Sequence, residues 1–153
     1  MKLETARLTL IPCTEEIVAQ AQEYEAGDHV FMYLEKLRKN PDLLGWGVWY
    51  VVERATNKVV GDMGFKGKLD EDRTVEVGYG ILSFAQGKGY ATESVQTLIE
   101  WALLDECVDT IVAECLETNA PSIRVLEKVG MKRIDEQNGM IYWKRGKINE
   151  LSY

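Results

Sequence analysis

The stretch SFAQGKGYATES, residues 83–94, places two glycines around a lysine directly before a helix-like sequence. Gly87 and Gly89 carry no side chains, so backbone N–H groups there can approach a ligand closely. The first turn of the following helix adds unpaired N–H groups and the positive end of a helix dipole. Lys88 contributes a positive charge and Thr92 a hydroxyl. The stretch therefore predicts a binding site for an anion, most simply a phosphate.

Two common phosphate-binding motifs fit this stretch poorly. The Walker pattern GxxxxGK[ST] does not occur in the sequence. A dinucleotide-binding GxGxxG follows a continuously apolar strand, whereas residues 74–82 alternate, and only the first two glycines of the pattern are present. A plain glycine-rich turn before a helix remains an alternative if the loop is considered alone.

The residues on either side of the loop predict a mixed α+β domain. Alternating or apolar runs indicate strands, and apolar residues repeating every 3.6 positions indicate helices. The predicted order is β-α-α-β-β-β-α-β-α-β-β, a mostly antiparallel sheet of about seven strands. Its one parallel pair is expected across the helix that follows the loop. Strands are predicted at residues 7–12, 46–54, 59–66, 74–82 and 110–115 and in a hairpin within 131–145, and helices at 14–26, 29–39, 91–106 and 119–129.

The composition predicts one soluble domain over residues 1–153, with residues 146–153 as a loose tail. Hydrophobic residues make up 46% and charged residues 28% of the chain, and no apolar run is long enough to span a bilayer. Glu4 and Arg7 interrupt the N-terminal apolar stretch, which argues against a signal peptide. A cytoplasmic protein that does not bind membranes is therefore expected.

Charge and rare residues restrict the function further. The formal net charge of −7 argues against nucleic-acid binding and suits a cationic partner. The three cysteines show no CxxC spacing, and reduced thiols are expected. His29 is the only histidine, so neither a histidine metal site nor a nucleophile–histidine triad is predicted. His29 is expected to be a surface or hydrogen-bonded residue, and no metal is expected.

The string QGKGYA, residues 86–91, matches [RQ]xxGx[GA], the pyrophosphate-binding motif of the GNAT superfamily of N-acetyltransferases. Further stretches resemble the same superfamily at its usual spacing, most closely the branch of ribosomal-protein N-terminal acetyltransferases. These are LETARLTLIP, EVGYGI, YATES and NAPSIRVLEKVGM. The resemblance covers nearly the whole chain and is most specific over residues 75–131. It implies a GNAT-like fold and an acetyl-CoA-dependent transfer to an amine.

The resemblance also implies which residues hold acetyl-CoA. Ile81 and Leu82 would pair their backbone with the pantetheine arm, in a gap between two separating strands. Asn119 would hydrogen-bond this arm, and Ser122 would lie near the thiol. The pyrophosphate would be held at the loop and first helical turn, by Gln86, Gly87, Lys88, Gly89, Tyr90, Ala91 and Thr92.

Acyl transfer to an amine requires a base, an oxyanion donor and a proton for the leaving thiolate. Glu76 is the predicted base, acting through water, because it shares one strand face with Gly78 and Gly80. A salt bridge to an exposed cation is the alternative role for Glu76. The oxyanion donor is expected near Leu82. Many family members carry a tyrosine acid at the position of Leu126, so Ser122 either replaces it or only positions the thiol.

The acceptor amine cannot be named from the sequence. A protein N-terminus, a basic peptide or a small amine are the expected classes, and a homodimer is a further expectation. Trp46, Trp49, Tyr50 and Tyr33 are candidates for the acceptor pocket, with burial in the core as the alternative. Two other functions remain open. One is a non-catalytic CoA-binding regulator on the same fold, and the other is a transferase that uses a different acyl-CoA.

Overall fold

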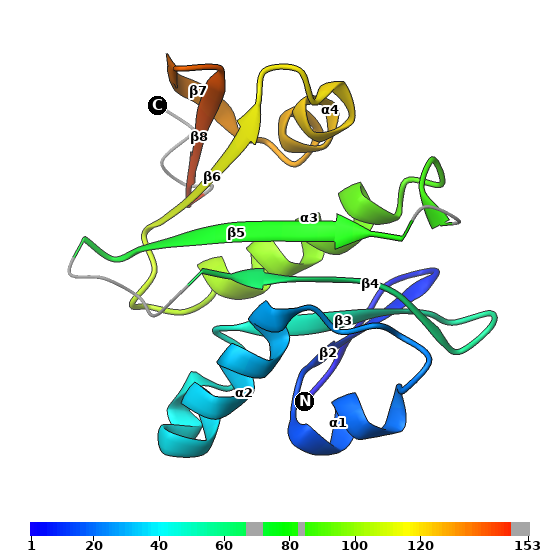
Figure 1. The fold of residues 1–153 in the computed structure, drawn as a ribbon. Helices are drawn as coiled ribbons and strands as arrows, with labels where there is room; N and C mark the ends of the chain where they lie inside the picture. The colour runs from blue at the N-terminus through cyan, green and yellow to red at the C-terminus, as the bar shows by residue number, and fades with distance from the viewer. Residues whose placement is uncertain (67–71, 83–84, 148–153) are drawn as a thin grey trace.

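The computed structural model describes residues 1–66, 72–82 and 85–147 of the chain. These residues form one eight-stranded sheet in the order β1-β2-β3-β4-β5-β6-β8-β7, with helices on both faces (Figure 1). The strands are β1 (Leu3–Glu4), β2 (Leu8–Pro12), β3 (Val48–Glu53), β4 (Lys58–Phe65), β5 (Thr74–Ile81), β6 (Thr110–Leu116), β7 (Lys132–Gln137) and β8 (Met140–Gly146). The helices are α1 (Glu15–Gln20), α2 (Asp28–Lys39), the short 3-10 helix η1 (Pro41–Leu43), α3 (Tyr90–Leu103) and α4 (Ala120–Lys128).

The predicted mixed, mostly antiparallel sheet is confirmed. The two strands β5 and β6 run parallel because α3 crosses between them, and every other pairing in the sheet is antiparallel. The eighth strand is the two-residue β1, which pairs Leu3 with Leu10 of β2. It is too short to show the alternation by which strands are recognised from sequence.

The first helix is much shorter than its predicted range of 14–26. Thr14 caps it as expected, since its hydroxyl accepts the Ile17 N–H at 3.2 Å. The helix ends at Gln20, however, and the chain then turns so that Tyr24 packs edge-on against Tyr50, with ring centroids 5.0 Å apart. This tertiary contact outweighs the helical tendency of residues 21–26. The predicted tail also begins later, because β8 includes Gly146, and residues 148–153 lie outside the described residues.

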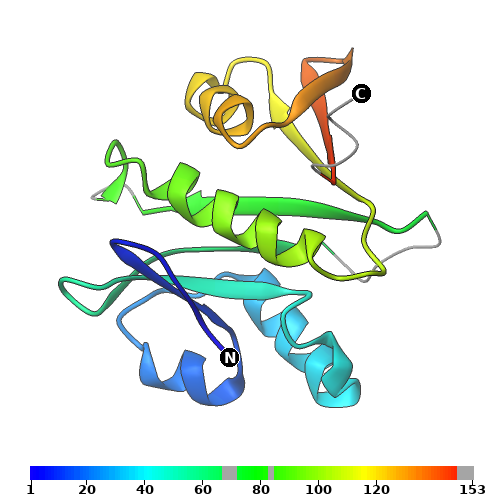
Figure 2. The same ribbon diagram turned by 180° about the vertical axis from the view of Figure 1, so that it is seen from behind.

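The core lies on both faces of the sheet. The larger cluster is on the side of α3, which Figure 2 shows in front of the strands, and it includes Val95, Leu98 and Leu126. The smaller cluster lies under α1 and α2 and includes Val30 and Tyr50. Both faces are therefore covered, and the sheet separates two compartments.

The sheet opens between β5 and β6. These strands pair only from Thr74–Glu76 to Thr110–Val112. Beyond this point β6 stays paired with β8 as far as Leu116, while β5 stays paired with β4 as far as Ile81. The two strands therefore separate toward their C-terminal ends, as Figure 1 shows. The splay that the family resemblance implied is present.

Glu53, at the end of β3, ties this strand to the start of α3. Its carboxylate accepts hydrogen bonds from the Tyr90 hydroxyl at 2.5 Å and the Thr56 hydroxyl at 2.8 Å. Lys88 Nζ lies 3.8 Å from it. These contacts, above all the Tyr90 hydrogen bond, lower the pKa of Glu53 below its ordinary value of 4.5.

Replacing Gly64 should destabilise the centre of the sheet. A Cβ at Gly64 would lie 1.8 Å from the carbonyl oxygen of Gly47, which accepts the Phe65 N–H at 3.0 Å. Gly64→Ala should lower the free energy of unfolding by about 2 kcal/mol or more. Gly80→Ala is the matched control, because a Cβ at Gly80 meets nothing within 4 Å, and its change should stay within about 0.5 kcal/mol. Urea unfolding measures both, and equal stabilities would contradict the close contact.

Glu53 should make folding sensitive to acid. Its pKa is lower in the folded than in the unfolded chain, so its stabilisation is complete above pH 4.5 and is lost as the pH falls through the folded-state pKa. Glu53→Gln should therefore be less stable than the wild type at neutral pH and lose less stability on acidification. Glu4→Gln, which removes an exposed partner of Lys2, should keep the wild-type acid dependence. Identical acid limbs for Glu53→Gln and wild type in pH-dependent thermal unfolding would refute this role.

Candidate functional site

Beyond Glu76, the edge of β5 that faces β6 is unpaired, and every second residue turns its backbone groups toward the gap between the two strands, here called the splay. The Leu82 N–H donates to the Val60 carbonyl at 2.8 Å, and the Lys66 N–H donates to the Glu76 carbonyl at 2.8 Å, so even-numbered residues of β5 bond to β4. Alternation along the strand then turns the N–H and C=O groups of Tyr79 and Ile81 toward the splay. Leu82 was expected to supply the oxyanion donor, but its N–H is already bonded within the sheet.

Both glycines of the loop at the end of β5 adopt a backbone conformation that other residues rarely adopt. Gly87 and Gly89 adopt left-handed conformations, with φ of 79° and 82°, and a Cβ at Gly87 would meet nothing within 4 Å. Gly89 is the N-cap of α3 and makes no side-chain capping bond, so the first-turn N–H groups from Tyr90 on are available to a ligand. Ser83 and Phe84, which begin the loop, lie outside the described residues.

Side chains around the loop hold it in place, and its two cations, Arg7 and Lys88, are each paired with a carboxylate. Gln86 Nε2 donates to the Ile81 carbonyl at 2.8 Å and so braces the loop against β5. The Arg7 guanidinium lies 4.6 Å from the Tyr90 ring centroid and 2.8 Å from Glu93. Lys88 Nζ lies 5.7 Å from the centroid of the same Tyr90 ring. Two half-exposed cations thus flank the uncapped start of α3. Ala91 and Thr92 are half-buried in its first turn.

Asn119 and Ser122 lie across the splay, at the start of α4. The Asn119 side-chain oxygen accepts the Ser122 N–H at 3.2 Å, which caps α4 and leaves the Asn119 amide NH2 as a donor. The Ser122 hydroxyl accepts a hydrogen bond from the Tyr79 hydroxyl at 3.2 Å. Burial raises the pKa of Tyr79, so its hydroxyl keeps its proton at neutral pH. Leu126 is buried in the core at 1% exposure and can donate nothing.

Glu76 lies at the closed end of the splay. Its carboxylate forms a salt bridge with Lys66 Nζ at 3.0 Å, so the alternative role as a cation partner is realised. Glu114 lies 4.0 Å from the same ammonium group. The Glu76 side chain is 31% exposed and shares its strand face with Gly78 and Gly80. A Cβ at Gly80 would meet nothing within 4 Å, whereas a Cβ at Gly78 would lie 3.2 Å from Lys66 Cε.

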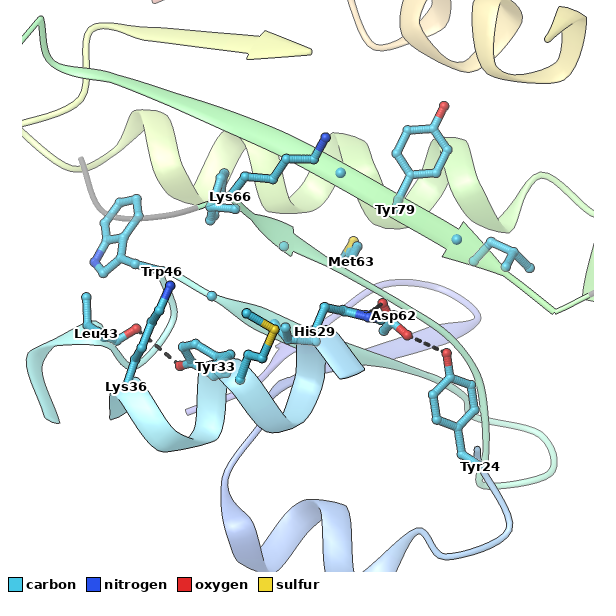
Figure 3. A pocket seen from close by; sticks show the side chains of 18 of the residues that line it. Tyr24, His29, Tyr33, Lys36, Leu43, Trp46, Asp62, Met63, Lys66 and Tyr79 are labelled. Atoms are coloured by element: carbon cyan, nitrogen blue, oxygen red, sulfur yellow. Dashed lines mark hydrogen bonds and ion pairs between the residues drawn. The ribbon is translucent and has the colours of Figure 1, made fainter. Parts of the chain in front are cut away.

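A cavity of about 660 Å³ lies between α2, β4 and the C-terminal half of β5 (Figure 3). Gly78 and Gly80 belong to its wall. Trp46 and Tyr33, two of the four aromatic candidates, line it, whereas Trp49 and Tyr50 are fully buried in the core. The other residues that contribute atoms to its wall are Tyr24, His29, Met32, Lys36, Leu43, Val48, Asp62, Met63, Phe65, Lys66, Tyr79, Ile81 and Leu82.

Asp62 is the carboxylate inside this cavity, and the sequence analysis did not identify it. Its side chain is 16% exposed, accepts the Tyr24 hydroxyl at 2.5 Å and lies 2.8 Å from His29 Nε2 (Figure 3). Burial and this hydrogen bond raise the pKa of Tyr24. Asp62 pairs in register with Gly80 and therefore faces the same side of the sheet. An acidic residue within the apolar strand VVGDMGF was the available signal.

No group of three or more His, Cys, Asp or Glu residues suited to a metal ion occurs within residues 1–66, 72–82 and 85–147. Over the same residues, no helix is long and apolar enough to cross a membrane.

Relatives of this chain are known at the levels of sequence and structure. YjdG of Bacillus subtilis (strain 168), described as an uncharacterized N-acetyltransferase, is 38% identical over 98 residues, which cover 64% of this chain and 58% of YjdG. The chain thus spans little more than half the length of this curated relative.

Two solved structures share the fold. The ribosomal-protein-S5-alanine acetyltransferase from Vibrio fischeri superposes with a TM-score of 0.79 at 18% identity, covering 97% of this chain and 98% of that one. RimL, described as a ribosomal L7/L12 alpha-N-protein acetyltransferase in complex with coenzyme A, gives a TM-score of 0.72 at 17% identity, covering 95% and 98%. These identities establish the fold alone. The family model described as the acetyltransferase (GNAT) domain matches residues 7–132, and the chain therefore belongs to the GNAT acetyltransferase family.

Proposed function

We propose that this protein is an N-acetyltransferase that moves an acetyl group from acetyl-CoA to a primary amine. The observation that carries the proposal is the open edge of β5, which leads directly to the uncapped N-terminus of α3. An extended arm with amide groups can add to such an edge as a strand does, and phosphates can bind at the helix terminus. The coenzyme A complex of RimL, which has the same fold, supports this assignment.

The residues present fit the pyrophosphate and the pantetheine arm of the donor. Backbone N–H groups at Gly87 and Gly89 would bind the pyrophosphate, and a Cβ at Gly87 would occupy the space left open there. Arg7 and Lys88 would add positive charge beside it. The arm would pair with Tyr79 and Ile81, with the Asn119 amide as a further donor. Gln86 would act by holding the loop against β5.

The transfer itself would take place where β5 and β6 meet. Bound acetyl-CoA supplies the reactive thioester. Glu76, through a water, would take the proton that the amine must lose, and Lys66 would keep its carboxylate in place. The Tyr79 N–H, which faces the splay, would stabilise the oxyanion in place of the Leu82 N–H. Ser122, hydrogen-bonded to the Tyr79 hydroxyl, would hold or protonate the departing sulfur.

Gly89→Glu should weaken coenzyme A binding by about tenfold or more, because it places a carboxylate where a pyrophosphate would lie. Gly89→Ala is the matched control, since it introduces the same backbone strain at φ 82° without the charge, and its loss should be clearly smaller. Calorimetric titration with coenzyme A measures both affinities. Wild-type affinity in Gly89→Glu would mean that the loop is only a turn.

Glu76→Gln should lower kcat by about 100-fold or more while the Kd for coenzyme A stays the same, because only proton removal is affected. Glu114→Gln removes the second carboxylate near Lys66 and should keep a nearly normal kcat. Release of thiol from acetyl-CoA in the presence of an amine gives the rates. Normal turnover in Glu76→Gln would reduce Glu76 to a salt-bridge partner, and absence of turnover in the wild type would favour a non-catalytic CoA-binding role.

A further inference from the structure

The 660 Å³ cavity beside β5 has Asp62 at one end, Lys36 at the other and an apolar wall between them, and under the proposed function it is the acceptor site. From this arrangement we propose that the acceptor is a primary amine that an apolar body joins to an anionic group. Asp62 receives the ammonium, and Lys36 receives the anion. The inference rests on the proposed function, because it identifies the substrate class of the same site.

Asp62 marks the ammonium end. It lies opposite Gly80 in the sheet register, beside the stretch of β5 that has no side chain on the cavity face. Tyr24 and His29 each occupy one carboxylate oxygen, and each oxygen can accept a second hydrogen bond. An ammonium group bound here would lie next to the backbone that separates the cavity from the splay. Asp62 therefore docks the amine four residues along β5 from Glu76, and the amine must move along the Gly80–Gly78 face of the strand before Glu76 can take its proton.

The wall between the ends is apolar and follows one face of α2. His29, Met32, Tyr33 and Lys36 occupy positions i, i+3, i+4 and i+7 of this helix, and all four line the cavity (Figure 3). The two middle residues therefore present a thioether and an aromatic ring between two polar ends. Trp46, Met63 and Phe65 extend this surface on the side of β3 and β4.

Lys36 marks the anionic end. It lies two helical turns after His29, about 10 Å along the helix axis. Within the part of the chain that the structure describes, its ammonium group makes no ion pair or side-chain hydrogen bond. Nearby cations are already neutralised, since Arg38 pairs with Glu15 and Lys66 with Glu76. Lys36 is thus the cation of this wall that remains free to bind an acceptor.

This arrangement selects acceptors by length and charge. A diamine would place a second ammonium against Lys36, and a simple alkylamine would leave Lys36 without a partner. An α-amino acid carries its carboxylate too close to its amine to reach both ends. The net charge of −7 favoured a cationic acceptor, but the cavity wall carries its own local charges.

Binding tests the inference without requiring turnover. His29 is the only histidine, so its imidazole NMR signal reports what enters the cavity beside Asp62. ε-Aminocaproate, hexylamine and cadaverine are titrated with and without coenzyme A. The wild type should bind ε-aminocaproate about five- to tenfold more tightly than hexylamine, and cadaverine should bind more weakly than either. Lys36→Met should reduce this preference to about one, whereas Lys39→Met, on the same helix but outside the cavity wall, should keep it.

Three outcomes would overturn the inference. The first is equal affinity for ε-aminocaproate and hexylamine, and the second is a preference that survives Lys36→Met. The third is an unchanged His29 signal with all three amines. Failure of the proposed function would instead appear as a lack of coenzyme A binding in calorimetry, a separate measurement. Two C-terminally amidated peptides distinguish the source of the amine. Preferential acetylation of Met-Glu-Ala over Met-Lys-Ala supports an acidic protein N-terminus. Turnover of ε-aminocaproate but neither peptide supports a free small molecule.

Discussion

Pairing between β5 and β6 stops after Glu76 and Val112, and the geometry of the site follows from that stop. β6 is held on β8 along its whole length and β5 on β4, so neither strand can bend to close the gap. Backbone groups of Tyr79 and Ile81 consequently face the opening. Backbone polar groups must bond to water, protein or a ligand, because leaving them unpaired is costly. Under the proposed function, an arm carrying amides would pair with the Tyr79 groups and the Ile81 N–H, while the Ile81 carbonyl accepts Gln86 Nε2.

Two glycines lie between the β5–β6 opening and the cavity beside α2. Gly78 and Gly80 lie on the cavity face of β5, so only backbone separates the two compartments there. Larger residues at these positions would project side chains into the cavity. The helices on the two faces are correspondingly different in role. Helix α3 begins at the anion-binding loop, whereas α2 supplies one wall of the cavity, and each is anchored by its own core cluster.

Local patterns predicted most of the fold because they depend on neighbouring residues. The hairpin turn at Asn138 and Gly139 is an example, with φ of 54° and 80° as the Asn-Gly pair predicts. Helix α1 shows the limit, since its end depends on Tyr24 reaching Asp62, 38 residues further along the chain. Burial of Trp49 in the core and exposure of Trp46 to the cavity likewise depend on how the sheet is covered, not on the residue type.

The sequence by itself determined the order of the elements from β2 onward, except for the short η1, and the resemblance to the GNAT family, because each depends on residues close together or on motif spacing. Only the tertiary structure decided that Tyr79 and Ile81, and not Leu82, present backbone groups to the splay. It also decided that Asp62 lies in the cavity while Glu76 is paired with Lys66. The physical reason is strand register. Side chains and backbone groups face opposite sides of a strand at successive residues. The side that a given residue faces is therefore set by long-range strand pairing and not by composition.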